Sequence, residues 1–205
     1  MRKILSTLLI ATLFCTCSKG ENKTLPSNEA VEHLQKTYST KDRSSLLQAL
    51  TELKNGGTAA KDAAREILEL KGVLWLGPED ADLLKDIHSL LESKDKRDKR
   101  AALQLLAYIH HDSSLPYIEK YIKDQNSELR EWSVFAAGKY QNPKLKTLII
   151  EKLNDQAYMV KRRAVQALEN YADDKDVQDK LFELLKDASL NYDASIILSR
   201  KGLIK

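Results

Sequence analysis

The feature that most constrains the fold of this chain is an internal repeat with a period of 31 residues. The clearest copies are DQNSELREWSVFAAGKY at 124–140 and DQAYMVKRRAVQALENY at 155–171. The matching positions include Asp124 with Asp155, Arg130 with Lys161 and, one unit earlier, Lys99, and Tyr140 with Tyr171. A chain that repeats at this interval is expected to stack similar units, each contacting only its neighbours.

Each unit is predicted to contain two short helices. The first is rich in small residues and is expected over 99–109, 129–140 and 160–171. The second is rich in Leu and Ile and is expected over 116–123, 144–153 and 176–185. Apolar positions in these segments recur at i, i+3, i+4 and i+7, which is the pattern of a helix with one buried face. Small side chains should let neighbouring first helices approach closely.

Two charged positions recur with the repeat. A basic residue stands near the start of each first helix, at Lys99, Arg130 and Lys161. An acidic residue closes each second helix, at Asp124, Asp155 and Asp187. We interpret both positions as structural, because repeat-periodic charges are expected to stabilise interfaces between neighbouring units. A role of the basic residues in binding a ligand is the alternative.

This pattern resembles HEAT-like repeats, especially the short version of the bilin-lyase-related group. The resemblance is carried by the basic position, the Ala-rich first helix and the closing Asp, over about residues 60–187. It implies an all-α chain, an αα-solenoid with irregular caps, over residues 29–205. Residues 29–54, with helices expected near 28–37 and 42–54, would form the first cap, and 193–202 a final half-repeat. The lyase activity does not follow, since fold does not determine function.

Composition agrees with a helical chain and gives little support for a polyanionic partner. Charged residues make up 31% and aromatic residues 6%, with only 7 Gly and 4 Pro. The formal charge of the whole chain is +3. Without residues 1–16, which include Arg2 and Lys3, the chain has 31 basic and 30 acidic residues. The basic runs at 93–100 and 160–163 are short, and Asp95 and Asp98 interrupt the first. We therefore expect no nucleic-acid partner.

The N-terminus resembles a bacterial lipoprotein signal. Residues 1–3 are basic at two positions, residues 4–14 are uncharged and mostly apolar, and the run ends in LFCTCSKG. Eleven such residues fit a secretory signal and are too few to span a bilayer. The resemblance implies cleavage after residue 16 and lipidation of Cys17, with Cys15 as the less fitting alternative. A plain secretory signal is the other interpretation; metal and redox spacings of cysteine are absent.

The predicted domain organisation follows from this N-terminal signal. Residues 1–16 would be the signal peptide and 17–28 a flexible tether, because the latter stretch is polar and without helical periodicity. Residues 29–205 would be the solenoid. The mature protein is expected to be exported and lipid-anchored in the cell envelope, with the outer membrane favoured.

One pair of aromatic residues departs from the repeat. Trp132 aligns with Ala101 and Arg163, and Phe135 aligns with Gln104 and Gln166. Large aromatic residues at positions that are otherwise small or polar predict a partner-binding patch, with filling of a local packing gap as the alternative. His110, His111 and Asp112 are interpreted as a turn with capping potential. Trp75 is expected to plug the end of a helix pair.

The leading functional hypothesis is a membrane-anchored, non-catalytic scaffold that binds a protein partner, with the stacked second helices giving a curved surface. No catalytic residue, metal site, cofactor or small-molecule substrate is evident in the sequence. Two alternatives stay open. One is a lyase-type enzyme or enzyme subunit, which rests on the family resemblance alone. The other is a nucleic-acid-binding solenoid.

Overall fold

The computed structural model describes residues 43–55 and 57–204, and over this part of the chain it contains helices and loops but no strand. The predicted all-α solenoid is confirmed. The helices are α3 (Arg43–Asn55), α4 (Thr58–Trp75), η1 (Pro78–Leu83), α5 (Leu84–Leu91), α6 (Lys96–Ile109), η2 (Asp112–Ser114), α7 (Leu115–Tyr121), α8 (Ser127–Lys139), α9 (Pro143–Glu151), η3 (Lys152–Asn154), α10 (Tyr158–Leu168), η4 (Glu169–Tyr171), α11 (Lys175–Leu184) and α12 (Asn191–Arg200).

Several predictions lie outside the described residues. These are the signal peptide, the tether, both cysteines, Cys15 and Cys17, and the helix expected near 28–37. The second helix of the first cap, expected over 42–54, corresponds to α3. The final half-repeat, expected over 193–202, corresponds to α12. In the described part of the chain, no helix is both long enough and apolar enough to cross a membrane.

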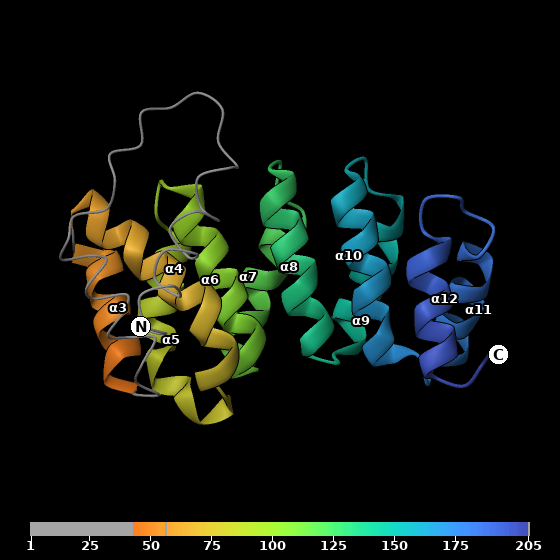
Figure 1. Ribbon diagram of the computed structural model, residues 1–205, viewed down its shortest axis with the longest axis horizontal. Coiled ribbons are helices and arrows are strands. Elements are labelled where there is room, and N and C mark those ends of the chain that lie inside the picture. Colours follow the sequence, from red (N-terminus) through yellow and green to blue (C-terminus); the bar gives the residue numbers. More distant parts are fainter. Residues whose placement is uncertain (1–42, 56, 205) are drawn as a thin grey trace, which may run out of the picture.

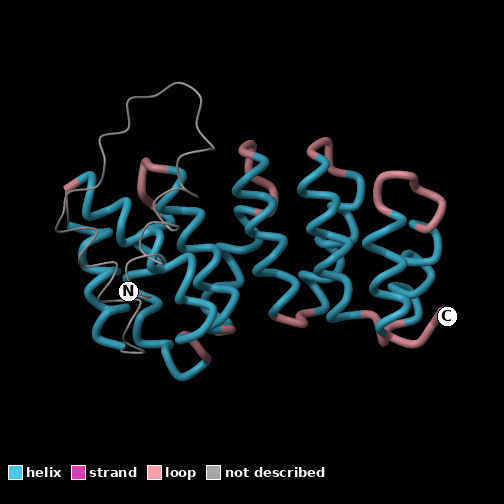
Figure 2. The backbone as a smooth tube through the Cα atoms, in the orientation of Figure 1, coloured by secondary structure: helices cyan, strands magenta, loops and turns pink. Residues whose placement is uncertain are grey.

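The helices form a row of pairs along the long axis of the molecule (Figure 1). The first helices of successive units are neighbours, so that α4 contacts α6, α6 contacts α8, α8 contacts α10 and α10 contacts α12. Each first helix also packs on second helices, as α8 does on α7 and α9. Short loops join the helices at both ends of the pairs (Figure 2). The stack therefore has a first-helix layer and a second-helix layer.

The first helices approach closely because small residues line their contact. Ser133, Ala136, Ala137 and Gly138 of α8 are buried, as are several alanines of α6 and α10. A Cβ added at Gly138 would lie 2.7 Å from Cβ of Ala167 and 3.0 Å from its Cα. The helix backbones of α8 and α10 are thus nearly in contact at Gly138.

Tyrosines at the ends of first helices bond to the preceding first helix. The hydroxyl of Tyr140 donates to the carbonyl of Leu106 at 3.1 Å, and that of Tyr171 donates to the carbonyl of Ala137 at 3.2 Å. Burial raises the pKa of Tyr171 to about 12. The two bonds are one repeat apart, and each is worth about 1 kcal/mol. The recurring tyrosine therefore joins neighbouring units.

The closing acidic residues shape the loops that lead into the first helices. The side chains of Asp124, Asp155 and Asp187 accept the backbone N–H two residues further on, at 2.8, 3.0 and 2.8 Å. Ser93 accepts the N–H of Asp95 in the same way at 3.1 Å. Such side-chain turns mimic a backbone turn. These residues therefore end one unit and begin the next.

Candidate functional site

The recurring basic position acts differently in each unit. Arg130 donates from Nε and Nη2 to the carboxylate of Asp155 at 2.8 and 2.7 Å, and from Nη1 to the carbonyls of Asp124 and Gln125. Lys99 instead places Nζ 5.5 Å from the ring centre of Tyr121. Among the described residues only Arg130 of the three forms an ion pair with a closing Asp.

The Arg130–Asp155 pair is mostly shielded from solvent. The side chain of Asp155 is 5% exposed and that of Arg130 is 15% exposed. Burial opposes ionisation of Asp155, but the hydrogen bonds from Arg130 and from the Ala157 N–H outweigh it, so the pKa of Asp155 lies below its usual range. For Lys161, the structure shows a weaker interaction. Its charge contributes, after the Ser189 hydrogen bonds, to lowering the pKa of Asp187.

The aromatic pair lies half-buried on the outer side of α8. The rings of Trp132 and Phe135 meet edge to face, with centroids 5.6 Å apart and an interplanar angle of 83°. The guanidinium carbon of Arg163, on α10, lies 5.2 Å from the Trp132 ring centre and 5.4 Å from that of Phe135. Tyr108, on α6, contacts Phe135 at a centroid distance of 6.1 Å. The cluster thus joins three neighbouring first helices.

Both interpretations of the aromatic pair have a structural counterpart. Trp132 packs against the core formed mainly by α3–α6, while Phe135 packs against the core formed mainly by α8–α12. The pair therefore bridges two parts of the core. Neither ring is fully buried, so each also presents surface to solvent. The pair lies on the first-helix layer, as its place in the helix predicted over 129–140 implies, and not on the second helices that we expected to give a curved surface.

We call the solvent-facing side of α6, α8, α10 and α12 the first-helix face. Charges alternate along it at the repeat interval, in the order Arg100, Glu131, Arg162 and Asp193. They form ion pairs between adjacent helices, Arg100 with Glu128 at 2.9 Å, Glu131 with Arg163 at 2.9 Å and Arg162 with Asp193 at 3.0 Å. This alternation is visible in the sequence alignment, and our sequence analysis missed it.

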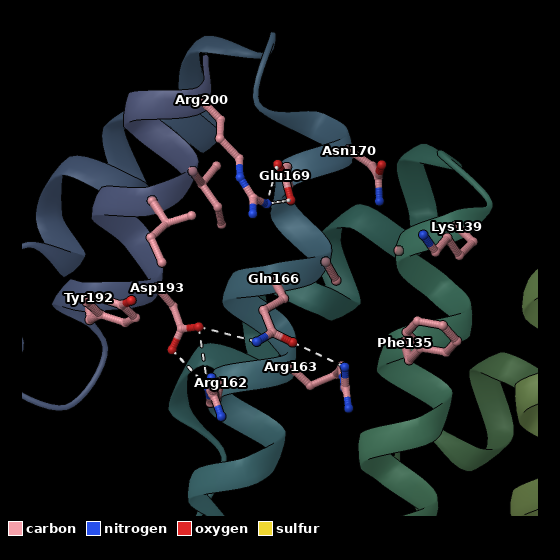
Figure 3. Close-up of a pocket in the computed structure, with 14 residues that line it drawn as sticks. Phe135, Lys139, Arg162, Arg163, Gln166, Glu169, Asn170, Tyr192, Asp193 and Arg200 are labelled. Carbon is pink, nitrogen blue, oxygen red and sulfur yellow. Dashed lines mark hydrogen bonds and ion pairs between the residues drawn. The ribbon is translucent and has the colours of Figure 1, made fainter. Parts of the chain in front are cut away.

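A groove of about 430 Å³ lies on the first-helix face between α8, α10 and α12 (Figure 3). Its lining includes Phe135 and Lys139 of α8, Arg162 and Gln166 of α10, and Tyr192 and Arg200 of α12. Gln166 donates to Asp193 at 3.2 Å and accepts from Arg163 at 3.1 Å, which links the polar residues of α10 to α12. One member of the predicted patch, Phe135, therefore lines the groove.

A second groove, of about 690 Å³, lies on the opposite layer between α9 and α11. Its lining is mostly charged. Lys146 donates to Asp174 at 2.8 Å and to Asp176 at 3.1 and 3.3 Å. Phe182, also on α11, is 39% exposed. This layer thus offers a natural comparison for the first-helix face.

Of the remaining predicted features, the stretch from His110 to Asp112 lies between α6 and α7. His110 ends α6 in the left-handed conformation, with φ 51°, and His111 precedes η2 and accepts the N–H of Ser113. These residues form the turn expected from the sequence. Trp75 is the last residue of α4, and its side chain lies outside those described. The described residues contain no group of three or more His, Cys, Asp or Glu side chains placed to hold a metal ion.

Comparison with known proteins agrees with this architecture. A family model described as HEAT repeats matches residues 84–151. The protein YibA of Escherichia coli strain K12 is 30% identical over 95 residues, and so is YibA of strain O157:H7. The similar stretch covers 45% of this chain but only 34% of either relative, so the chain spans about a third of their length. Together with the repeat and the helical stack, these matches support a HEAT-like α-solenoid fold for the described part of the chain.

Proposed function

We propose that this chain is a lipid-anchored scaffold that binds a protein partner through its first-helix face and catalyses no reaction itself. The observation that carries the proposal is the partly exposed cluster of Trp132, Phe135 and Arg163, which spans neighbouring helices of one face. Trp and Arg are enriched among residues that dominate binding energy at protein interfaces.

The cluster is also held in place before any partner arrives. Arg163 donates to Glu131 at 2.9 Å and to Gln166 at 3.1 Å, while its guanidinium lies over both aromatic rings. A side chain that is already ordered loses little conformational entropy on binding. Preorganised aromatic and guanidinium groups are therefore suited to anchor a partner on this face.

The anchor rests on the sequence of the first 28 residues. A basic start, an uncharged run and a Cys at position 17 resemble a lipoprotein signal, and the polar stretch that follows suits a tether. Each buried CH₂ of an acyl chain contributes about 0.8 kcal/mol to membrane binding, so several chains would hold the protein stably. The solenoid would then present its face to partners close to the membrane.

The binding part of the proposal is tested by quantitative affinity capture from detergent-solubilised envelopes. Wild type, Trp132→Ala and the control Phe182→Ala, which removes an exposed aromatic from the second-helix layer, are compared at equal amounts of bait. We expect at least one protein whose capture falls about tenfold with Trp132→Ala and is unchanged with Phe182→Ala, since central anchors are commonly worth 2 kcal/mol or more. Thermal unfolding by circular dichroism confirms that both variants are folded.

Capture that is unaffected by Trp132→Ala, in a variant shown to be folded, would contradict the assignment of the binding face. A purified protein that carries a coloured chromophore would instead favour the lyase-type alternative.

A further inference from the structure

The groove on the first-helix face carries more basic than acidic residues. Its basic lining residues are Lys139, Arg162, Arg163 and Arg200, and its acidic ones are Glu169 and Asp193. The basic residues therefore exceed the acidic ones by two. A concave site that is lined mainly by one sign of charge focuses the electric field and attracts ligands of opposite sign.

The difference in solvent exposure between the two partners of each ion pair strengthens this positive bias. In each pair at the groove the cation is more exposed than its acid. Arg162 is 40% exposed against 10% for Asp193, and Arg200 is 65% exposed against 34% for Glu169. A ligand that approaches from solvent thus meets the guanidinium groups before it meets the carboxylates.

These guanidinium groups retain donors for a ligand. Arg162 uses Nε for both of its bonds to Asp193, at 3.0 and 3.3 Å, and Arg200 uses Nη1 for its bonds to Glu169. An Arg side chain has five N–H donors in a flat fork that matches a carboxylate. Arg162, Arg200 and Lys139 come from three helices around the same hollow (Figure 3). The groove is therefore equipped to bind several carboxylates at once.

The groove on the second-helix layer shows the opposite arrangement. Its lining contains three lysines, Lys146, Lys180 and Lys186, and four acids, Glu151, Asp176, Glu183 and Asp187. Lys146 is only 20% exposed, whereas its partners Asp174 and Asp176 are 50% and 58% exposed. There the carboxylates are outermost. The arrangement in which the basic side chains are more exposed than their acidic partners is therefore found in the first-helix groove and not in the groove of the second-helix layer.

Tyr192, at the start of α12, lines the first-helix groove, and two further apolar side chains are exposed at the start of α10. Tyr192 is 69% exposed, and Tyr158 and Met159 are 46% and 47% exposed. Tyr158 donates to the carbonyl of Ser189 at 3.4 Å, which places it beside the loop into α12. A flat bilayer surface is a poor fit to a groove, whereas a protein segment can place both acidic and apolar side chains here.

We propose that this groove binds an extended acidic segment of the protein partner, with at least two carboxylates and one large apolar side chain. This inference rests on the proposed function and names the chemistry of the partner. Three adjacent helices with axes about 10 Å apart span about 20 Å, which an extended chain covers with about six residues. The carboxylates bind Arg162, Arg200 and Lys139, and the apolar side chain packs beside Tyr192.

The test uses the protein as it is extracted from the membrane, with its whole solenoid, and fluorescence anisotropy. The probe is a labelled peptide Glu-Asp-Phe-Glu-Asp-Leu, and the comparison peptide replaces its acids by the corresponding amides. The double variant Lys139→Gln/Arg200→Gln removes two cations from the groove, and the matched control Lys180→Gln/Lys186→Gln removes two from the opposite layer. We expect the groove variant to weaken binding of the acidic peptide about tenfold or more, and the control to change it less than twofold.

Equal affinity of the groove variant and the control for the acidic peptide would overturn the proposal, as would an absence of binding. If the amide peptide binds as tightly as the acidic one and Trp132→Ala abolishes both, the acidic specificity is wrong while the scaffold function stands. If no peptide binds and Trp132→Ala leaves partner capture intact, both the acidic-segment proposal and the proposed binding face are wrong. Tighter binding of single-stranded DNA or of phosphatidylglycerol vesicles at the same residues would also overturn the proposal.

Discussion

At the scale of single residues, the solenoid depends on a few polar side chains that join one unit to the next. Arg130 is the clearest case, because it binds the carboxylate of Asp155, at the boundary with the following unit, and two carbonyls of the loop before its own helix. Removing one partner of a shielded pair leaves the other without compensation, which costs more than the pair contributes net. In this unit the basic residue therefore links the loop before α8 to the loop before α10, as the structural interpretation expects.

Asp155→Asn should lower the free energy of unfolding by about 2 kcal/mol at pH 7, because Arg130 loses its charged partner. The pKa of Asp155 is lowered in the folded state, so its stabilisation is complete above the unfolded value of about 4 and is lost as pH falls below it. The difference between wild type and variant should therefore shrink between pH 4 and pH 2. Urea unfolding at several pH values measures it.

The control for this prediction is Asp179→Asn. Asp179 pairs with Lys175 on the surface of α11, where both side chains are more than half exposed. Such pairs contribute at most about 1 kcal/mol, and commonly less. Equal losses for the two variants at pH 7 would contradict the structural role assigned to Asp155.

At the scale of helices, close packing within the first-helix layer limits which substitutions the protein tolerates. Gly138 faces the backbone of α10 at Ala167, and no side chain fits between the two helices at that point. The spacing of α8 and α10 in turn sets the distance between Phe135 and Arg163, which both line the groove. Packing and binding geometry are thus connected through one glycine.

Gly138→Ala should destabilise the protein by about 1 kcal/mol or more, although alanine favours helix by about that amount over glycine. The reason is that the added methyl group would force α8 and α10 apart, and overpacking commonly costs 1–3 kcal/mol. Gly57→Ala is the matched control, because a Cβ there meets nothing within 4 Å. Chemical unfolding gives both values, and a stabilised Gly138→Ala protein would contradict the close approach.

The sequence predicted the helices well because their signal is local. The second helices expected over 116–123, 144–153 and 176–185 correspond to α7, α9 and α11 within a few residues. The first helix expected over 160–171 is divided into α10 and η4, since apolar periodicity does not distinguish an α-helix from a final 3₁₀ turn. The local pattern is thus sufficient to predict that these helices form and less reliable for predicting where they end.

The groove could not be predicted in the same way, because it depends on how three helices from different units lie together. Phe135 was identified from its departure from the repeat, but Tyr192 and Arg200 lie on α12, where the alignment offers little to compare. Arg162 could have been identified from the alternation of charge at the repeat interval. Its position above Asp193 became visible only once α10 and α12 were placed.

At the scale of the whole molecule, the helical stack presents the first-helix face, and the predicted N-terminal signal would determine where the protein is located. The leader predicts that the membrane-extracted protein begins at Cys17, lacks residues 1–16 and carries added acyl mass. Intact-mass spectrometry measures this directly. Cys17→Ser should leave the protein without acyl mass, while Cys15→Ser should not. A mass equal to all 205 residues would overturn the proposed location.

The central claim is that a protein partner binds the first-helix face, and site-specific photo-crosslinking tests it most directly. A photoreactive phenylalanine analogue is placed at Phe135 and, separately, at the exposed Phe182 of the second-helix layer. Illumination of intact cell envelopes should give a discrete higher-mass adduct from position 135 and none from position 182. An adduct from position 182 alone, or from neither position, would contradict the claim.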